Sequence, residues 1–250
     1  MSLNIVIPMA GRGSRFEKAG YTFPKPLIDV DGKPMISRVI ENLKPKDRKD
    51  VRFIFIVQRE HYEKYDLKNV LKNAVGDLEM EVIQIDGVTE GAACTVLLGA
   101  DYIDNEDELM LANSDQLVSE ESIDSWFTLI RIGLPPKEEG LIMTFNSSHP
   151  KWSYAKIDDK RNVIEVAEKQ VISEHATVGI YWFNRGKDFV QAAKNMIRKD
   201  VRHNGEFYVC PVYNELILED KKIGIFTIPQ ENMMGLGDPE SLKIYMDSLK

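Results

Sequence analysis

The residues best suited to chemistry lie in one glycine-rich segment near the amino terminus, PMAGRGSRF over Pro8–Phe16. Gly11 and Gly13 permit backbone turns that aim successive N–H groups at an anion. The segment from Gly11 to Lys25 contains four basic residues and one acidic residue, although the whole chain carries a formal charge of −8. The cations are Arg12, Arg15, Lys18 and Lys25, and the acid is Glu17. A basic turn on an acidic chain favours a polyphosphate ligand.

Two familiar phosphate motifs do not match this segment. The dinucleotide fingerprint G-x-G-x-x-G fails, because Phe16 occupies the position of its third glycine. A P-loop requires a Lys-Ser or Lys-Thr pair directly after a glycine, and this segment contains none. What remains is a longer string, G-x-G-x-R-F followed by PKPL at 24–27 and GKPM at 32–35.

The segment directly follows an apolar run, Leu3–Met9, that is typical of a buried strand. Further apolar runs of strand length alternate with segments of helical period through the first half of the chain. The runs are Phe53–Val57, Val82–Ile85 and Leu109–Ala112, and the helical segments are 35–43, Glu60–Ala74 and Ala92–Ile103. This alternation predicts a parallel sheet covered by helices on both faces. Ligands bind at the carboxyl ends of such strands, where the glycine-rich segment lies.

The second half of the chain has a different pattern, in which short polar segments separate several strand-like runs. These runs are Leu141–Phe145, Tyr154–Ile157, Val163–Val166 and Thr177–Phe183, and helical spacing returns at 189–197, 212–217 and 242–249. Strands joined by short connections pair as antiparallel neighbours, so we expect a mixed sheet. No repeat or Ser/Gly linker interrupts the sequence, which predicts a single α/β domain over residues 1–250.

Composition argues against several classes of function. Hydrophobic residues make up 43% of the 250 residues, enough for a substantial core, so we do not expect a disordered chain. The net charge of −8 argues against non-specific nucleic-acid binding. No apolar run approaches the ~20 residues of a membrane span and no secretory leader is recognisable, so we expect a cytoplasmic protein that does not bind membranes. The four histidines are scattered, and none lies in a nucleophile motif.

The string AGRGSRF…PKPLIDVDGKPMI, within residues 10–36, resembles the opening of the nucleoside-triphosphate transferase family, the sugar-phosphate nucleotidyltransferases such as glucose-1-phosphate thymidylyltransferases. Weaker matches continue to near residue 240. The resemblance implies a three-layer α/β/α fold with a mixed, mostly parallel sheet, of the nucleotide-diphospho-sugar transferase type. It also implies an enzyme that transfers a nucleoside monophosphate from a nucleoside triphosphate to a phosphorylated acceptor, releasing pyrophosphate with the help of Mg²⁺. We expect residues 1–118 to bind the nucleotide and residues 119–250 to bind the acceptor.

On the nucleotide side the resemblance assigns roles position by position. The nucleotide would be bound by backbone groups of Ala10, Gly11 and Gly13. Arg15 would hold the triphosphate and neutralise the charge that develops on pyrophosphate. Lys25 would reach the α-phosphate, and its two flanking prolines would hold it in place before the reaction.

Two further positions bear on the base. Gly91 matches a small residue that lies at a helix start beside the base and ribose, or is simply a glycine that precedes a helix. Asp86 stands where thymidylyltransferases carry a base-reading Gln. A carboxylate accepts hydrogen bonds but cannot donate one to a pyrimidine carbonyl, so Asp86 favours the amino group of cytosine and hence CTP, with UTP or dTTP still open.

Two carboxylates are candidates for metal binding. Asp115 follows the apolar run Leu109–Ala112 and matches the metal-binding Asp of the family, which holds Mg²⁺ on the α-phosphate. The second metal-binding Asp of the family falls at Gly235 here, and Asp238 lies three residues later. Because Asp238 precedes Pro239, it can bind metal or cap the last helix.

On the acceptor side the resemblance points to four regions. Glu168 would bind acceptor hydroxyls and Lys169 the acceptor phosphate, so that Lys169 helps to align the attacking oxygen. Ala155 falls where the family has a small residue that contacts the acceptor. Gly179 belongs to a matching stretch, TVGIY. Glu206 would touch the acceptor, or act only as a helix-start acid.

The identity of the acceptor stays open. A sugar 1-phosphate is the default of the family, and a smaller phosphate or phosphoamide activated with CTP for capsule or headgroup synthesis is the alternative. A glycosyltransferase of related fold is a second alternative, although Asn113-Ser114-Asp115 supplies only one acid of the D-x-D pair such enzymes use. A non-catalytic binding subunit is a third, disfavoured because Lys25, Asp115 and Lys169 are all present. Dimers are common in the family, which leaves a homo-oligomer open.

Overall fold

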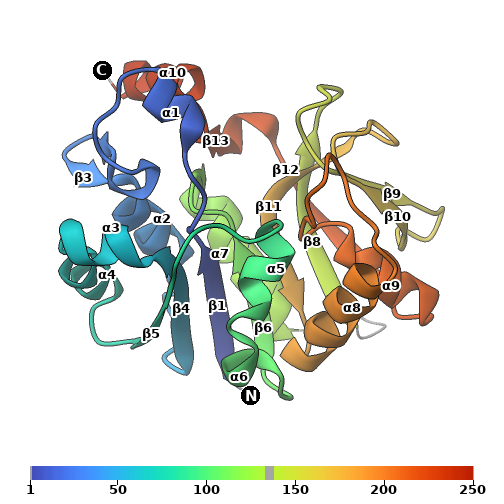
Figure 1. The fold of residues 1–250 in the computed structure, drawn as a ribbon. Coiled ribbons are helices and arrows are strands. Elements are labelled where there is room, and N and C mark those ends of the chain that lie inside the picture. The colour runs from blue at the N-terminus through green and yellow to red at the C-terminus, as the bar shows by residue number, and fades with distance from the viewer. Residues whose placement is uncertain (1, 133–137, 250) are drawn as a thin grey trace.

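The computed structural model describes residues 2–132 and 138–249, and within them a nine-stranded mixed sheet forms the centre of the molecule (Figure 1). The main path of the sheet runs β10-β9-β11-β6-β1-β4-β5, with β8 paired to β11 and β12 to β8. The strands are β1 (Leu3–Pro8), β4 (Val51–Gln58), β5 (Glu79–Ile85), β6 (Glu108–Ala112), β8 (Gly140–Asn146), β9 (Tyr154–Ile157), β10 (Val163–Ala167), β11 (His175–Phe183) and β12 (Ile223–Ile228). The neighbours β6, β1, β4 and β5 are parallel, whereas β11 runs antiparallel to β6, β8 and β9. The mixed sheet expected from the sequence is confirmed.

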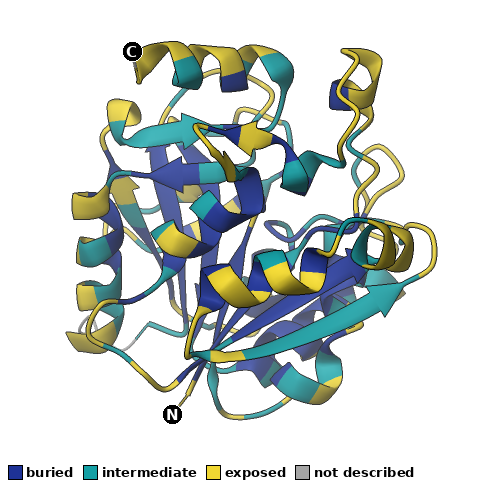
Figure 2. Ribbon diagram, turned by 90° about the vertical axis from the view of Figure 1, so that its left-hand side faces the viewer, coloured by how far each residue is buried: buried dark blue, intermediate teal, exposed yellow. Residues whose placement is uncertain are grey.

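Helices cover both faces of this sheet and complete the three layers (Figures 1 and 2). One apolar cluster contains residues of α2, α4 and α7, and the other contains residues of α5, α8 and α9. The helices are α1 (Ser14–Lys18), α2 (Met35–Leu43), α3 (Arg59–Lys64), α4 (Leu67–Val75), α5 (Ala92–Leu97), α6 (Ala100–Ile103), α7 (Glu120–Ile132), α8 (Gly186–Arg198), α9 (Val212–Leu218) and α10 (Pro239–Ser248). The two remaining sheets are short ribbons, β2 (Asp29–Val30) with β3 (Lys33–Pro34) and β7 (Gln116–Val118) with β13 (Met233–Gly235). None of the helices within the described ranges is both long and apolar enough to span a bilayer.

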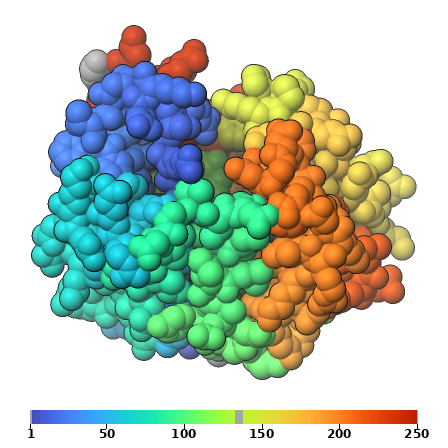
Figure 3. Space-filling view, in the orientation of Figure 1, coloured from blue at the N-terminus to red at the C-terminus, as the bar shows by residue number. Residues whose placement is uncertain are grey.

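The carboxyl ends of the parallel strands meet at one edge of the sheet. β1 leads into the glycine-rich segment and β6 leads toward Asp115. The neighbouring antiparallel strand β11 joins the same edge, because the N–H of Asn113 donates to the carbonyl of Gly179 at 3.0 Å. Figure 3 shows the molecular surface hollowed between the amino-terminal segment in blue and the orange segment near residue 200. This edge therefore brings residues of both halves of the chain around one depression.

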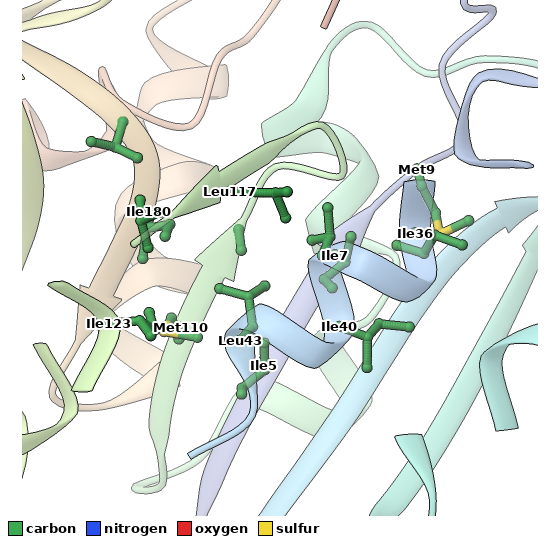
Figure 4. Close-up of a cluster of buried hydrophobic side chains, with 14 of the residues drawn as sticks. Ile5, Ile7, Met9, Ile36, Ile40, Leu43, Met110, Leu117, Ile123 and Ile180 are labelled. Carbon is green, nitrogen blue, oxygen red and sulfur yellow. The ribbon is translucent and has the colours of Figure 1, made fainter. Parts of the chain in front are cut away.

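Successive side chains of β1 point to opposite faces of the sheet, so this central strand packs against both layers of helices. Ile5 and Ile7 are fully buried on the face covered by α2, whereas Val6 belongs to the opposite cluster. On α2, Ile36 and Ile40 lie one helical turn apart and are buried in the same apolar cluster as Ile5 and Ile7 (Figure 4). Burying an apolar side chain of this size contributes about 1.5–3 kcal/mol, so these contacts fix the strand from which the glycine-rich segment departs.

Several elements differ from the sequence-based expectation, which did not include α1 or the short strands β2, β3, β7 and β13. The single helix expected over Glu60–Ala74 is two helices, because Asp66 adopts a left-handed conformation with φ 50° between α3 and α4. The helix expected over Ala92–Ile103 is likewise divided near Gly99 into α5 and α6. Helix α7 was not expected, since only Ser122, Ile123 and Trp126 of its 13 residues are buried. Strand β12 was not expected either, and it contains a glycine, which weakens a strand pattern.

Candidate functional site

A cavity of about 730 Å³ opens at the carboxyl edge of the sheet, and a second cavity of about 220 Å³ shares part of its wall. Both cavities are lined by Arg15, Lys25 and Ser114. The smaller one lies against the glycine-rich segment, including Gly11 and Gly13. The larger one extends to Glu168 and Lys169, which follow β10, and to Gly179 within β11. The predicted nucleotide and acceptor sides therefore open into adjoining space.

The glycine-rich segment is held close to Lys25. Gly13 has a left-handed conformation (φ +64°) at the start of α1, and a Cβ atom there would lie 3.1 Å from the Cβ of Lys25. Lys25 begins a short 3-10 turn, Lys25–Leu27, with Pro24 before it and Pro26 within it. Arg15 projects from α1 with 68% of its side chain exposed, so it is free to meet a ligand from solvent.

Lys25 and Asp115 form an ion pair in the wall of the larger cavity. The ammonium group of Lys25 donates to Oδ2 of Asp115, and the two side chains are 18% and 15% exposed. The backbone of Asp115 is fixed as well, since its carbonyl accepts the N–H of Leu236 at 2.8 Å. A Cβ atom at Gly237 would lie 2.7 Å from Oδ2 of Asp115, so a side chain at position 237 would displace this carboxylate. The carboxylate of Asp115 is thus placed by contacts from two distant segments.

Asp238 caps α10 and lines the same cavity. Its Oδ1 accepts the N–H of Ser241 at 2.9 Å, and its Oδ2 accepts the hydroxyl of Ser241 at 3.0 Å. Burial raises the pKa of Asp238, but the bonds from Ser241 and the charges of Lys151 and Arg15 outweigh burial and lower the pKa. The nearest Nη of Arg15 lies 4.0 Å from Oδ2. Of the two roles expected for Asp238, capping is confirmed.

The donor set of this wall fits a magnesium ion. The described residues contain no group of three or more His, Cys, Asp or Glu side chains arranged to hold a metal. Mg²⁺ needs none, because it is commonly bound through one or two carboxylates together with substrate phosphates. Asp115 already accommodates a cationic group at Oδ2, and Asp238 lines the same cavity.

Glu168 and Lys169, which follow β10, also line the larger cavity. Glu168 is 9% exposed, and its Oε2 accepts the hydroxyl of Ser153. Burial raises the pKa of the Glu168 carboxyl, although Ser153 and Lys169 act in the opposite direction. Gly179 adopts φ +94°, and a Cβ atom there would meet Oε1 of Gln116 at 2.1 Å. This glycine therefore allows β11 to pass close to the chain that follows β6.

The structure brings most of the predicted residues together. The larger cavity is lined by Arg15, Lys25, Asp115, Glu168, Lys169, Gly179, Glu206 and Asp238, and the smaller one by Gly11 and Gly13 in addition. The linings do not include Ala10, Asp86, Gly91 and Ala155. Asp86 is largely exposed and pairs with Arg59 at 3.0 Å. Ala155 is buried in the core, whereas Ser153, two residues earlier, faces the cavity.

Sequence reasoning missed several residues at this edge. The cavity-lining residues that it did not assign a role include Gln116, Lys151, Trp152, Ser153 and Tyr208. It also missed Gln58, the last residue of β4, whose amide group donates to the carbonyls of Ala10 at 2.5 Å and Gly87 at 2.6 Å. A polar residue at the carboxyl end of a buried parallel strand was a usable signal for Gln58. No local motif marks the others.

Comparison with known proteins shows to which family the chain is similar. A family model described as "Nucleotidyl transferase" matches residues 5–222. The bifunctional protein GlmU of Methanocaldococcus jannaschii is 28% identical over 225 residues, which cover 89% of this chain and 49% of that protein. The chain thus spans about half the length of the curated relatives it matches.

Solved structures agree on the fold. A nucleoside-diphosphate-sugar pyrophosphorylase from Vibrio cholerae superposes with a TM-score of 0.79 and 25% identity, covering 97% of this chain and 99% of that one. The inositol-1-phosphate CTP transferase from T. maritima superposes with a TM-score of 0.75 at 16% identity, covering 99% of this chain and 96% of that one. The three-layer fold of nucleotide-diphospho-sugar transferases is confirmed.

Proposed function

The chain belongs to the nucleotidyl transferase family, and from that premise we propose that it transfers a nucleoside monophosphate from a nucleoside triphosphate to a phosphorylated acceptor and releases pyrophosphate. One observation carries this proposal: Arg15, Lys25, Asp115, Glu168 and Lys169 all line one cavity. Cations on one wall suit a triphosphate, and a carboxylate beside a lysine on the other suits hydroxyls and a phosphate.

The reaction requires no covalent intermediate on the protein. An oxygen of the acceptor phosphate attacks the α-phosphorus in line, the bond from that phosphorus to the bridging oxygen breaks, and pyrophosphate leaves with that oxygen. Lys25 neutralises charge at the α-phosphate, Arg15 binds the outer phosphates, and Lys169 holds the acceptor phosphate. Catalysis then consists of positioning and charge neutralisation.

Magnesium completes the proposed site. Asp115 would hold Mg²⁺, with Asp238 as a second ligand, and the ion would neutralise phosphate oxygens as a Lewis acid. Asp238 would then serve two partners, because Ser241 already donates to both of its oxygens. EDTA is therefore expected to abolish turnover, and added Mg²⁺ to restore it.

For the substrates we propose a sugar 1-phosphate as the acceptor and CTP as the preferred nucleotide. The carboxylate at position 86 supports CTP by its chemistry alone, because it accepts the amino protons of cytosine but cannot donate to uracil or thymine. It lies outside the lining of both cavities. Arg59, paired with Asp86, adds donors beside that carboxylate and keeps UTP or dTTP as competitors. We propose that the reaction takes place in the cytoplasm.

A pyrophosphate-release assay over four nucleoside triphosphates and a panel of phosphorylated acceptors tests this function. We expect release that requires both substrates, and selectivity that identifies the base and the acceptor. A glycosyltransferase of the same fold would consume a nucleotide sugar and release no pyrophosphate. A non-catalytic binding subunit would bind nucleotide without turnover in any combination.

Gln58 is expected to set the width of the nucleotide side. Its amide group joins the glycine-rich segment at Ala10 to the loop at Gly87, so replacing Gln58 by Met removes two hydrogen bonds of about 1 kcal/mol each and lets the two loops separate. We predict that Gln58→Met raises the nucleotide KM about tenfold and leaves the acceptor KM within about twofold. Gln191→Met, on the exposed face of α8, is the matched control. An unchanged nucleotide KM would remove Gln58 from the site.

A further inference from the structure

Lys169 has an unusual backbone conformation and a well-defined side-chain partner. Its φ of 51° lies in the left-handed region, which a residue with a Cβ atom adopts only when its surroundings hold it there. The ammonium group donates to the hydroxyl of Tyr208 at 2.6 Å and lies 4.4 Å from the centroid of the same ring. Oε1 of Glu168 is farther away, at 3.9 Å. Tyr208, rather than the neighbouring acid, therefore fixes the end of the Lys169 side chain.

Tyr208 belongs to a segment, His203–Tyr208, that is anchored on the nucleotide half of the chain. The N–H of Phe207 donates to the carbonyl of Glu90 at 2.8 Å, and the carbonyl of Phe207 accepts the N–H of Ala93 at 3.0 Å. His203 and Glu206 close the segment as a β-bridge. Figure 1 shows α5, which begins just after this contact, beside the long connection that leads into α9. The lysine of the acceptor side is thus positioned by a segment docked on the other half.

We propose that Tyr208 is the positioning residue for Lys169, holding its ammonium group over the cavity where the acceptor phosphate would bind. This inference rests on the proposed function. A lysine side chain has about 2 kcal/mol of rotamer entropy, and Tyr208 limits that freedom before the acceptor arrives. The hydroxyl accepts one N–H and the ring face meets the positive charge, which leaves other ammonium protons free for a phosphate.

The electrostatic surroundings keep Tyr208 suited to this role. Burial raises the pKa of the Tyr208 phenol, Lys169 lowers it and the Glu206 carboxylate raises it, with a net increase. The phenol therefore stays neutral at physiological pH and accepts from Lys169 through a lone pair. Tyr208 and Lys169 both line the larger cavity, so the pair faces the proposed acceptor directly.

Kinetics of Tyr208→Phe and Tyr208→Leu, with glucose 1-phosphate as the acceptor, test the inference. We expect Tyr208→Phe to raise the acceptor KM about tenfold, because a hydrogen bond to a charged group is lost. Tyr208→Leu also loses the ring and is expected to raise the KM about threefold more. The nucleotide KM should change less than twofold in both. Tyr102→Phe, on α6 and outside the cavity, is the matched control.

A double-mutant cycle with Lys169→Ala separates positioning from direct contact. If Tyr208 acts through Lys169, Tyr208→Phe has no further effect on kcat/KM in the Lys169→Ala background. Effects that multiply in the double variant would overturn the inference, since Tyr208 would then act on the acceptor independently.

Labelling of lysines by an acylating reagent gives a readout that needs no turnover. Peptide mass spectrometry is expected to show that Lys169 reacts at least threefold faster in Tyr208→Leu than in the wild-type protein. Lys68 on α4 is the internal reference. An unchanged rate for Lys169 would overturn the positioning role. If glucose 1-phosphate were not turned over at all, the proposed function would fail for that acceptor, and the labelling would still decide the role of Tyr208.

Discussion

Replacing Lys25 by Met is expected to lower kcat about 10³-fold, the largest effect of any single change in the site. The ammonium group is mostly buried, is stiffened by prolines on both sides and already lies against Asp115. A cation placed before the reaction stabilises charge at the α-phosphate without reorganisation. Pre-steady-state and steady-state rates of pyrophosphate release measure the change, with Lys33→Met on the exposed β3 as a control. A kcat within about threefold of the unmodified protein would contradict the role of Lys25.

The same substitution leaves Asp115 as an unpaired, largely buried carboxylate, so stability must be separated from catalysis. Removing one partner of a buried ion pair costs about 3–5 kcal/mol when the other stays charged. We therefore expect Lys25→Met to lower the melting temperature. Adding Asp115→Asn should restore much of it, because the unpaired charge is gone. The rate of Lys25→Met itself is measured well below its melting temperature, so that a low kcat reports a catalytic defect and not an unstable fold.

Replacing Gly91 by Ala is expected to lower the free energy of unfolding by about 3 kcal/mol. Gly91 has φ +127°, and a Cβ atom there would lie 2.4 Å from the carbonyl oxygen and 2.5 Å from the nitrogen of Phe207. Backbone cannot move aside as a flexible side chain can, so the substitution must push the His203–Tyr208 segment away from α5. Thermal unfolding should show a melting temperature lower by about 6–12 °C.

Gly87 provides the control for Gly91 within the same loop. It also has a positive φ, 79°, but a Cβ atom there meets nothing within 4 Å. Gly87→Ala therefore carries only the backbone strain, about 1 kcal/mol, and should lower the melting temperature by about 2–4 °C. Equal losses for the two variants would show that the contact with Phe207 is not what requires a glycine at position 91.

Much of the fold could be predicted because the buried strands are continuous apolar runs. FIFIV in β4 is apolar on both faces, and LNIVI in β1 is apolar except at Asn4, so both strands need helices to cover both of their faces. Both strands lie between the two layers of helices. Helix α7 escaped prediction because only three of its 13 residues are buried, so it shows no continuous apolar stripe. The break at Asp66 escaped for another reason: a left-handed residue interrupts an apolar periodicity that itself continues into α4.

Some residues of the candidate site could also be predicted from the sequence, and others could not. Arg15, Lys25 and Asp115 could be singled out because each lies in a local string that carries chemistry by itself. Tyr208 could not, since its partner Lys169 is 39 residues away and only the folded chain brings the two together. Gln58 offered one signal, its place at the end of a buried strand, but its partners Ala10 and Gly87 are 48 and 29 residues away. For Asp86 the sequence predicts a role in reading the base, but it gives no sign of the ion pair with Arg59 that the structure shows.

The fate of labelled phosphates tests the central claim most directly. With nucleoside triphosphate labelled at the α-phosphorus in one reaction and at the γ-phosphorus in another, the account predicts that the α label enters a nucleotide joined to the acceptor. The γ label should appear in pyrophosphate in equal amount, and neither transfer should occur without the acceptor. Transfer of the γ label to the acceptor would contradict the transfer of a nucleoside monophosphate at this cavity. Release of pyrophosphate at the same rate with and without the acceptor would contradict it as well.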